Sequence, residues 1–274
     1  MPDHLALPTW RYIDSGPSTG SLNMAIDEAL LSRFEPNSSE PVLRTYEWDP
    51  PALSLGRFQR SEEVLDLDRC CNSAVSVVRR VTGGGTIYHA DELTYSIVCT
   101  SGHIPATASV KDSFRVLTGF LIDFYRTLGL NAVYAADTLA TTEHLGERTA
   151  FCFAGKETFD ILIDSNKIGG NAQRRLKNVI FQHGSIPIIN RSQLGLQYMK
   201  DRSPEYADNN VSLFDCGVTA DITTLKRLFL EAFERHMGVK ASLGCLSPGE
   251  LHMAQELSLK KYTSDRWNLQ GEVE

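Results

Sequence analysis

The sequence predicts an α+β fold, because groups of strand-like segments alternate with amphipathic helices. The helical segments carry apolar residues three and four positions apart. Three strand-like segments in the second half are joined by links of only two or three residues, which suits an antiparallel meander. A meander combined with separate helices is typical of α+β domains.

The first half of the chain is predicted to contain two helices with short strands between them. The first helix spans residues 21–34, with Ser21 as its N-cap. The second spans residues 110–128, between Ser109 as cap and Gly129 as terminator. The strands between them are "VLRTYEW" (42–48), "ALSLG" (52–56), "VSVVRRV" (75–81), "TIYH" (86–89) and "LTYSIVC" (93–99).

The predicted meander comes next, followed by a polar loop. Its three strands are residues 158–164, 167–175 and 179–188. Residues 199–210, "MKDRSPEYADNN", are strongly polar, so they are expected to form an exposed loop. This loop is the best candidate for a boundary within the chain.

The remainder of the chain is predicted to be helical. Asp221 caps one helix, and "SPGE" (247–250) is a capping box that opens a last helix ending near Tyr262. Two helices are too little for an independent enzyme domain. We therefore expect a single domain over residues 1–274, with a helical C-terminal extension from about residue 215.

The composition is that of an ordinary soluble globular protein, with 42% hydrophobic and 22% charged residues among 274. The formal net charge of -7 argues against a general nucleic-acid binder, which needs a basic surface. The N-terminus lacks the pattern of a signal peptide, and no apolar run reaches the roughly 18 residues that cross a bilayer. We expect a cytoplasmic protein with no nucleic-acid partner and no membrane contact.

The six cysteines show neither a CxxC pair nor a metal-type spacing with histidine. Thiols in a reducing compartment stay unpaired, so no disulfide and no metal site is predicted. Most of these cysteines are expected to be small buried hydrophobic residues.

The stretch "RRVTGGGTIYHADELTYSIV" (79–98) contains three consecutive glycines. A Walker-type phosphate loop requires Lys and Ser or Thr after the last glycine, and a dinucleotide fingerprint requires a helix there. Here Thr86 and Ile87 follow Gly85 and a strand-like pattern continues from them, so both nucleotide motifs are excluded. Two interpretations remain: a glycine-rich hairpin, or a bare backbone surface that lies against a ligand chain, with Arg79 and Arg80 supplying charge beside it.

Cys152 and Lys167 are the candidate reactive residues. Each has an ordinary alternative, because a cysteine between two phenylalanines is usually buried and inert, and a lysine at a strand start is usually solvated. One predicted strand separates them, which would place both near one end of adjacent strands. An ammonium group favours the thiolate form of a nearby cysteine, and the thiolate is the nucleophile.

His89 and His183 are the candidate proton carriers. Neither has metal-ligating residues at a suitable spacing. A structural histidine with satisfied hydrogen bonds is the alternative for both.

Four segments together resemble the lipoate–protein ligase and octanoyltransferase superfamily, which shares the biotin/lipoate protein ligase catalytic domain. They occur in the order expected for that family, and the C-terminal "AQELSLKKYTSDRWN" (254–268) also resembles its ending. The segments are "LRTYEWDPPALSLGRFQ" (43–59), "RRVTGGGTIYHADELTYSIV" (79–98), "CFAGKETFDILIDSNKIGGNAQRR" (152–175) and "FQHGSIPI" (181–188). The resemblance implies a mostly antiparallel sheet flanked by helices.

The resemblance also implies an acyl-binding site. In the family, the glycine-rich loop and the lysine-bearing strand line a tunnel for a medium-length acyl chain, and the lysine contacts the acyl carbonyl. On this sequence the matching lysine is Lys167. The expected substrate-binding residues are Arg79, Gly83, Gly84, Gly85, His89, Gly169, Gly170 and His183.

Within the superfamily, the sequence is closest to LipM-type octanoyltransferases. "ELTYS" (92–96) and the position of Cys152 resemble that type. The implied reaction moves octanoate from acyl carrier protein to Cys152 and then to a lysine of a lipoyl domain, such as glycine cleavage H protein, without metal or cofactor. The alternatives are an ATP-dependent lipoate–protein ligase, transfer between lipoyl domains, and a non-catalytic binding protein.

The acyl donor protein is acidic in this family, whereas the present chain is itself negatively charged. Docking would therefore depend on a local basic patch. Arg174, Arg175 and Lys177 are the candidates for such a patch.

Overall fold

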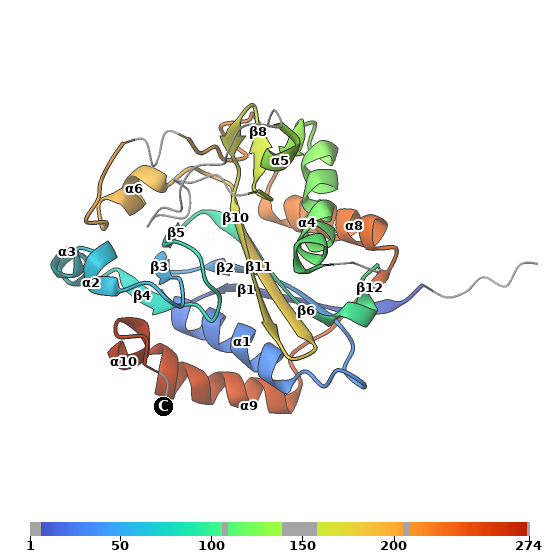
Figure 1. Ribbon diagram of the computed structural model, residues 1–274, viewed down its shortest axis with the longest axis horizontal. Helices are drawn as coiled ribbons and strands as arrows, with labels where there is room; N and C mark the ends of the chain where they lie inside the picture. The colour runs from blue at the N-terminus through green and yellow to red at the C-terminus, as the bar shows by residue number, and fades with distance from the viewer. Residues whose placement is uncertain (1–6, 106–108, 139–157, 205–208, 273–274) are drawn as a thin grey trace, which may run out of the picture.

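The computed structural model describes residues 7–105, 109–138, 158–204 and 209–272. It shows three β-sheets with helices packed around them, so the α+β prediction is confirmed (Figure 1).

The main sheet has six strands, and three of its five pairings are antiparallel. β11 pairs antiparallel with β10 and β6, and β6 pairs antiparallel with β2. β1 then pairs parallel with both β2 and β12. In spatial order the strands are β10 (Gly170–Leu176), β11 (Val179–Pro187), β6 (Glu92–Thr100), β2 (Val42–Trp48), β1 (Thr9–Ser18) and β12 (Lys240–Leu243).

Two sheets of three strands lie beside the main sheet. In the first, β3 pairs parallel with β4 and antiparallel with β5. Its strands are β4 (Ser76–Arg79), β3 (Ala52–Leu55) and β5 (Ile87–His89). The second is entirely antiparallel and consists of β7 (Ala132–Tyr134), β8 (Ile161–Ile163) and β9 (Asn166–Lys167).

Two pairs of helices cover the two faces of the main sheet (Figure 1). α1 packs against α9, and α4 packs against α8. The long helices are α1 (Gly20–Arg33), α4 (Val110–Thr127), α8 (Ile222–Met237) and α9 (Pro248–Leu257), which continues into a π-helical turn (Ser258–Tyr262). Short helices are α2 (Ser61–Val64), α3 (Leu67–Asn72), α5 (Ala135–Thr138), α6 (Ser192–Leu196), α10 (Asp265–Asn268) and a 3₁₀ turn (Ser101–His103).

The alternation of side chains along β6 explains why both faces of the sheet are covered. Tyr95 and Ile97 belong to the apolar core beneath α4 and α8, whereas Val98 belongs to the core beneath α1 and α9. Every residue of β6 is buried. A strand covered on both faces has no solvated side, and after Glu92 its residues are accordingly all apolar or hydroxyl-bearing.

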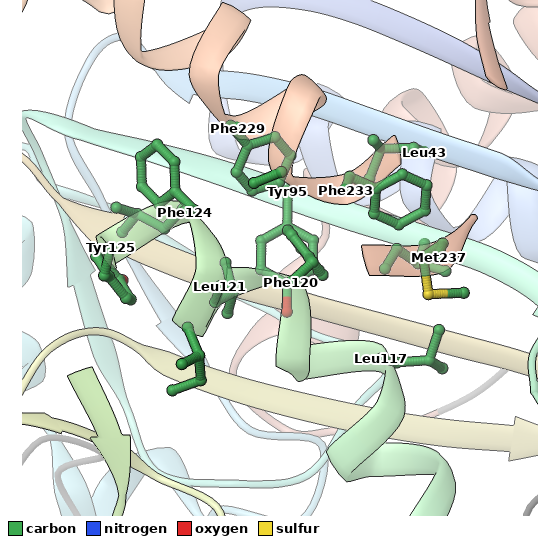
Figure 2. Close-up of a cluster of buried hydrophobic side chains, with 14 of the residues drawn as sticks. Leu43, Tyr95, Leu117, Phe120, Leu121, Phe124, Tyr125, Phe229, Phe233 and Met237 are labelled. Carbon is green, nitrogen blue, oxygen red and sulfur yellow. The ribbon is translucent and has the colours of Figure 1, made fainter. Parts of the chain in front are cut away.

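The larger core is rich in aromatic rings, which Figure 2 shows between α4, α8 and β6. The ring centroids of Tyr95 and Phe120 lie 5.4 Å apart, and those of Phe120 and Phe229 lie 5.0 Å apart. Both contacts of Phe120 are edge-to-face, the geometry that aromatic quadrupoles favour. This core fixes the positions of β6 and β11, and β11 carries the candidate residue His183.

Three of the predicted helix caps are confirmed. The Ser109 side chain accepts a hydrogen bond from the Asp112 amide, and the Asp221 side chain accepts one from the Thr224 amide. Ser247 forms the expected capping box at the start of α9. The first helix is the exception, because Thr19 rather than Ser21 caps α1.

The predicted strand 167–175 is wrong, because two strands in different sheets occupy this segment. Gly169 separates β9 from β10 and has a φ of +76°. A Cβ at Gly169 would lie 2.0 Å from the main-chain oxygen of Ser185, so only glycine fits. The meander is thus two antiparallel hairpins, β8–β9 in the small sheet and β10–β11 in the main sheet.

The predicted exposed loop 199–210 is wrong at both ends. Met199 is buried and forms a bridge with Leu65, and Asn210 is buried and forms a bridge with Lys167. Beyond this segment, β12 joins the edge of the main sheet beside β1. Within the described part of the chain, every helix is too short or too polar to cross a lipid bilayer.

Candidate functional site

The three glycines form a turn between β4 and β5, which we call the glycine turn (residues 83–85). Arg80 lies directly behind it and is buried. Its Nη2 donates hydrogen bonds to the main-chain oxygens of Gly83, at 3.2 Å, and Gly85, at 2.9 Å. Its Nη1 donates to both the main-chain oxygen and Oγ of Ser54, each at 2.7 Å. Arg80 therefore turns carbonyl groups of the glycine turn toward the protein.

The glycines of this region are needed for different reasons. A Cβ at Gly56 would lie 2.0 Å from the main-chain oxygen of Gly84, so the glycine turn packs directly on Gly56. Gly84 itself has a φ of +100°. At Gly83 the nearest atom to an added Cβ is a ring carbon of Phe58 at 3.9 Å, an ordinary contact. The fold therefore explains glycine at Gly56 and Gly84 but leaves room for a side chain at Gly83.

Arg79 points away from the glycine turn, although it is adjacent to Arg80 in sequence. Its guanidinium donates to five main-chain oxygens, three in the loop after β3 and two near the C-terminus. They belong to Gly56, Arg57, Gln59, Trp267 and Leu269. These contacts tie the C-terminal segment to the loop after β3, and substrate binding by Arg79 stays a prediction.

His89 is buried and has hydrogen-bond partners at both ring nitrogens. Nδ1 lies 2.7 Å from Oε1 of Glu92, and Nε2 lies 2.6 Å from Oγ of Ser54. The ring stacks on Trp48 with 3.8 Å between centroids. Glu92 also accepts hydrogen bonds from Thr94 and from Ser185.

His183 lies on β11 below the start of the glycine turn. Its Nε2 is 2.7 Å from Oγ1 of Thr82, and its Nδ1 is 3.7 Å from the Asp27 carboxylate. Burial lowers the pKa of His183, although Asp27 opposes this effect. The ring is therefore neutral at pH 7. Burial alone would raise the pKa of Asp27, but the Arg44 guanidinium and His183 reverse this and bring the pKa below its ordinary value.

Lys167 is buried rather than solvated. Its Nζ lies 2.7 Å from Oδ2 of Asp160, and the exposed fractions of the two side chains are only 3% and 9%. The strand pairing of β9 with β8 positions this pair, because Lys167 lies opposite Leu162 and Asp160 comes directly before β8. A buried ammonium group is tolerated when a carboxylate compensates its charge.

A small cavity of about 20 Å³ borders Glu92, Asn210 and Val211. This volume suits about one water molecule. Gly170 begins β10 and lies opposite Ser185, whose Oγ donates to Glu92. The segment that follows Lys167 is thus connected to the Glu92 network.

Cys152 lies outside the described residues, so its distance to Lys167 remains a prediction. Asp160, Glu92 and Ser54 all contact candidate residues but are not predicted as site residues from the sequence. For Glu92 a signal was present, since it follows His89 by three positions in "HADE".

The candidate basic patch does not form one surface. Arg174 and Arg175 are neighbours on β10, so their side chains leave opposite faces of the strand. Arg174 donates to the main-chain oxygen of Val81, beside the glycine turn, whereas Arg175 contacts Ser113 on α4. Arg174 is therefore the member of the set that lies near the candidate site.

The chain is similar in sequence to proteins of one type over nearly its whole length. It is 34% identical over 274 residues to an octanoyltransferase LipM of Anoxybacillus flavithermus, covering 94% of this chain and 97% of that protein. It is also 34% identical over 273 residues to an octanoyltransferase LipM of Bacillus subtilis, covering 95% and 98% of the two chains.

Solved structures share the fold. A lipoate-protein ligase A bound with ATP superposes with a TM-score of 0.81 at 23% identity, covering 96% of this chain and 100% of that chain. A putative lipoate protein ligase from T. acidophilum with bound lipoic acid gives a TM-score of 0.79 at 23% identity, covering 96% and 99%. The fold expected from the sequence is therefore confirmed.

The family model for the lipoyl protein ligase A/B catalytic domain matches residues 19–240. This match spans the glycine turn, Lys167 and both candidate histidines. Together with the near-complete coverage by relatives above 30% identity, it shows that the chain belongs to the lipoyl protein ligase A/B catalytic-domain family.

Proposed function

We propose that this protein is an octanoyltransferase that moves an octanoyl group onto a lysine of a lipoyl domain, in the assembly of lipoate. The observation that carries the proposal is the similarity to LipM octanoyltransferases over 94% of the chain or more. The donor would be octanoyl-acyl carrier protein, and glycine cleavage H protein is a suitable acceptor.

The first half-reaction loads the enzyme. The Cys152 thiolate attacks the carbonyl carbon of the octanoyl thioester, and the bond between that carbon and the donor sulfur breaks. The donor leaves as a thiol after taking a proton, and the octanoyl group stays on Cys152 as a thioester. One thioester replaces another, so the step requires no ATP.

Lys167 would stabilise the oxyanion that develops on the acyl carbonyl. A charged donor directed at such an oxyanion contributes on the order of 3 kcal/mol to transition-state stabilisation. The burial of Lys167 beside Asp160 supports this role, because an electrostatic contact is stronger away from water. Asp160 also restrains the ammonium group, which reduces the reorganisation needed when the carbonyl develops charge.

The second half-reaction forms an amide. The ε-amine of the acceptor lysine attacks the acyl-enzyme carbonyl, the bond to the Cys152 sulfur breaks, and the thiol is regenerated. The amine must first lose a proton, because an unperturbed lysine is charged at neutral pH. His89 and His183 are the candidate bases, and the neutral state of His183 suits a proton acceptor.

The glycine turn would lie against the acyl chain. The free space beside Gly83 supports this, since no atom of the described residues comes closer than 3.9 Å to an added Cβ there. A ligand chain would fill the space that a side chain would otherwise occupy.

Intact-mass spectrometry after mixing with octanoyl-acyl carrier protein tests the proposal. We expect one octanoyl adduct that maps to Cys152, is released by hydroxylamine and is absent from Cys152→Ala. Cys71→Ala is the matched control, because Cys71 is an exposed thiol on α3 and should leave the adduct unchanged. No adduct on the wild-type protein under turnover conditions would contradict the proposal.

The same proteins separate the alternatives. Modification of apo H protein by Cys152→Ala in the presence of ATP and lipoate would identify an ATP-dependent ligase. Preferential loading of Cys152 from acylated H protein, rather than from acyl carrier protein, would identify transfer between lipoyl domains.

A further inference from the structure

Glu92 occupies the centre of a buried hydrogen-bond network that joins two sheets. Its carboxylate accepts hydrogen bonds from Nδ1 of His89 at 2.7 Å, Oγ1 of Thr94 at 2.5 Å and Oγ of Ser185 at 2.7 Å. His89 belongs to β5 in a small sheet, whereas Thr94 and Ser185 belong to β6 and β11 in the main sheet. A carboxylate with three donors is well satisfied in spite of its burial.

The network continues from Glu92 to the glycine turn. Arg80 donates to Oγ of Ser54, and the same oxygen forms a hydrogen bond of 2.6 Å with Nε2 of His89. On the other side of the ring, Nδ1 of His89 lies 2.7 Å from Oε1 of Glu92. Glu92, His89, Ser54 and Arg80 thus form one continuous series of hydrogen bonds, which we call the relay.

The relay ends at Arg80, and Arg80 contacts the glycine turn. The same guanidinium that donates to Ser54 donates to the main-chain oxygens of Gly83 and Gly85. The orientation of this planar group is fixed by all of these contacts together, since the donors of arginine form a rigid fork. A change at Ser54 therefore alters the hydrogen bonds between the Arg80 guanidinium and the glycine turn.

We propose that Glu92 is a positioning residue for the glycine turn, acting through His89, Ser54 and Arg80. This rests on the proposed octanoyl transfer, in which the glycine turn contacts the acyl chain. The relay sets the distance between the turn and the acyl chain and so contributes to the choice of chain length. Glu92 and Ser54 act in this way without contact with the substrate.

Two variants break the relay at different points. In Glu92→Gln an amide nitrogen replaces one acceptor oxygen, so His89 and Ser185 cannot both donate to residue 92 as they do now. In Ser54→Ala the link between His89 and Arg80 is lost, while Glu92 keeps its donors. Ser54→Ala is the milder change and provides the test if Glu92→Gln does not fold.

The experiment measures single-turnover acylation of Cys152 in the full-length protein with hexanoyl, octanoyl and decanoyl thioesters of acyl carrier protein. We expect each variant to lower octanoyl loading at subsaturating donor about tenfold, the effect of one lost buried hydrogen bond. The preference for octanoyl over the other two should weaken. The double variant should be no slower than the slower single variant, because both changes interrupt one relay.

Glu250→Gln is the matched control. Glu250 is also a buried carboxylate, but it pairs with Arg11 and caps α9. It should lower the melting temperature without changing the preference among chain lengths. The inference is overturned if Glu92→Gln and Ser54→Ala retain the wild-type preference among chain lengths. It is also overturned if the rate of acylation in the double variant falls by the product of the two single effects. Absence of any adduct on the wild-type protein would instead overturn the proposed function, and this inference with it.

Discussion

Nζ of Lys167 lies 2.7 Å from the carboxylate of Asp160, and both side chains are almost completely removed from solvent. Breaking such a pair leaves a buried charge without its counterion, which is more destabilising than the loss of an exposed ion pair. The arrangement also keeps the ammonium group of Lys167 in one place. Asp160 thus links the stability of the β8–β9 hairpin to the chemistry proposed for Lys167.

Asp160→Asn should lower both stability and acylation. We expect a decrease in the free energy of unfolding on the order of 3 kcal/mol, because the buried ammonium loses its compensating charge. The measurements are urea unfolding and single-turnover loading of Cys152. Asp164→Asn is the control on the same hairpin, since Asp164 is exposed. Equal stability and equal loading for the two variants would contradict this assignment.

Gly83→Ala separates a structural need for glycine from a functional one. An added Cβ meets only Phe58 at 3.9 Å, so we expect a melting temperature within about two degrees of wild type. If the acyl chain passes beside Gly83, octanoyl loading should nevertheless fall at least about tenfold. Gly56→Ala provides the contrast, because its Cβ would collide with the main-chain oxygen of Gly84 and should lower stability as well. Normal loading by Gly83→Ala would remove the glycine turn from the acyl site.

Arg79→Lys should lower the stability of the protein and leave its affinity for the substrate unchanged. Lysine lacks the planar fork with which Arg79 donates to five main-chain oxygens. The unpaired carbonyls should lower the free energy of unfolding by about 2 kcal/mol, with the KM for the octanoyl donor unchanged. Arg60→Lys is the control, since Arg60 is exposed and forms only surface ion pairs. A raised KM at unchanged stability would instead support substrate binding by Arg79.

The helices were predictable because their end signals are local. Ser109, Asp221 and Ser247 each accept a hydrogen bond from an amide three positions along the chain, and that pattern is visible in the sequence. The break between β9 and β10 was not predictable in this way. Gly169 adopts its positive φ because Ser185 approaches from another part of the chain, and a single sequence does not show that contact.

The sequence indicates the unusual residues of the candidate site but not the acidic residues that contact them. The run of glycines and Lys167 stand out by composition and position, whereas Asp160 and Glu92 are ordinary acidic residues until strand pairing buries them. Adjacency in the sequence predicts a shared role for Arg79 and Arg80, yet β4 ends between them and they contact different segments. Adjacent residues in extended chain leave on opposite sides, which separates their roles.

The lowered pKa of His183 predicts a pH dependence of stability. Burial and the charges of Arg80 and His89 lower this pKa from 6.5, while Asp27 opposes them. As the pH falls below about 6.5, the unfolded chain binds a proton that native His183 does not, so the free energy of unfolding falls. Each unit by which the native pKa is lowered contributes about 1.4 kcal/mol.

His183→Gln should therefore flatten this pH dependence. Urea unfolding between about pH 7 and pH 5 should show a smaller loss of stability than in wild type, whatever the stability of the variant at pH 7. A residual slope is expected from His103, whose pKa burial also lowers. His252→Gln, at an exposed position on α9, controls for the loss of a histidine as such. An unchanged slope in His183→Gln would mean that His183 is protonated in the native protein as readily as in the unfolded chain.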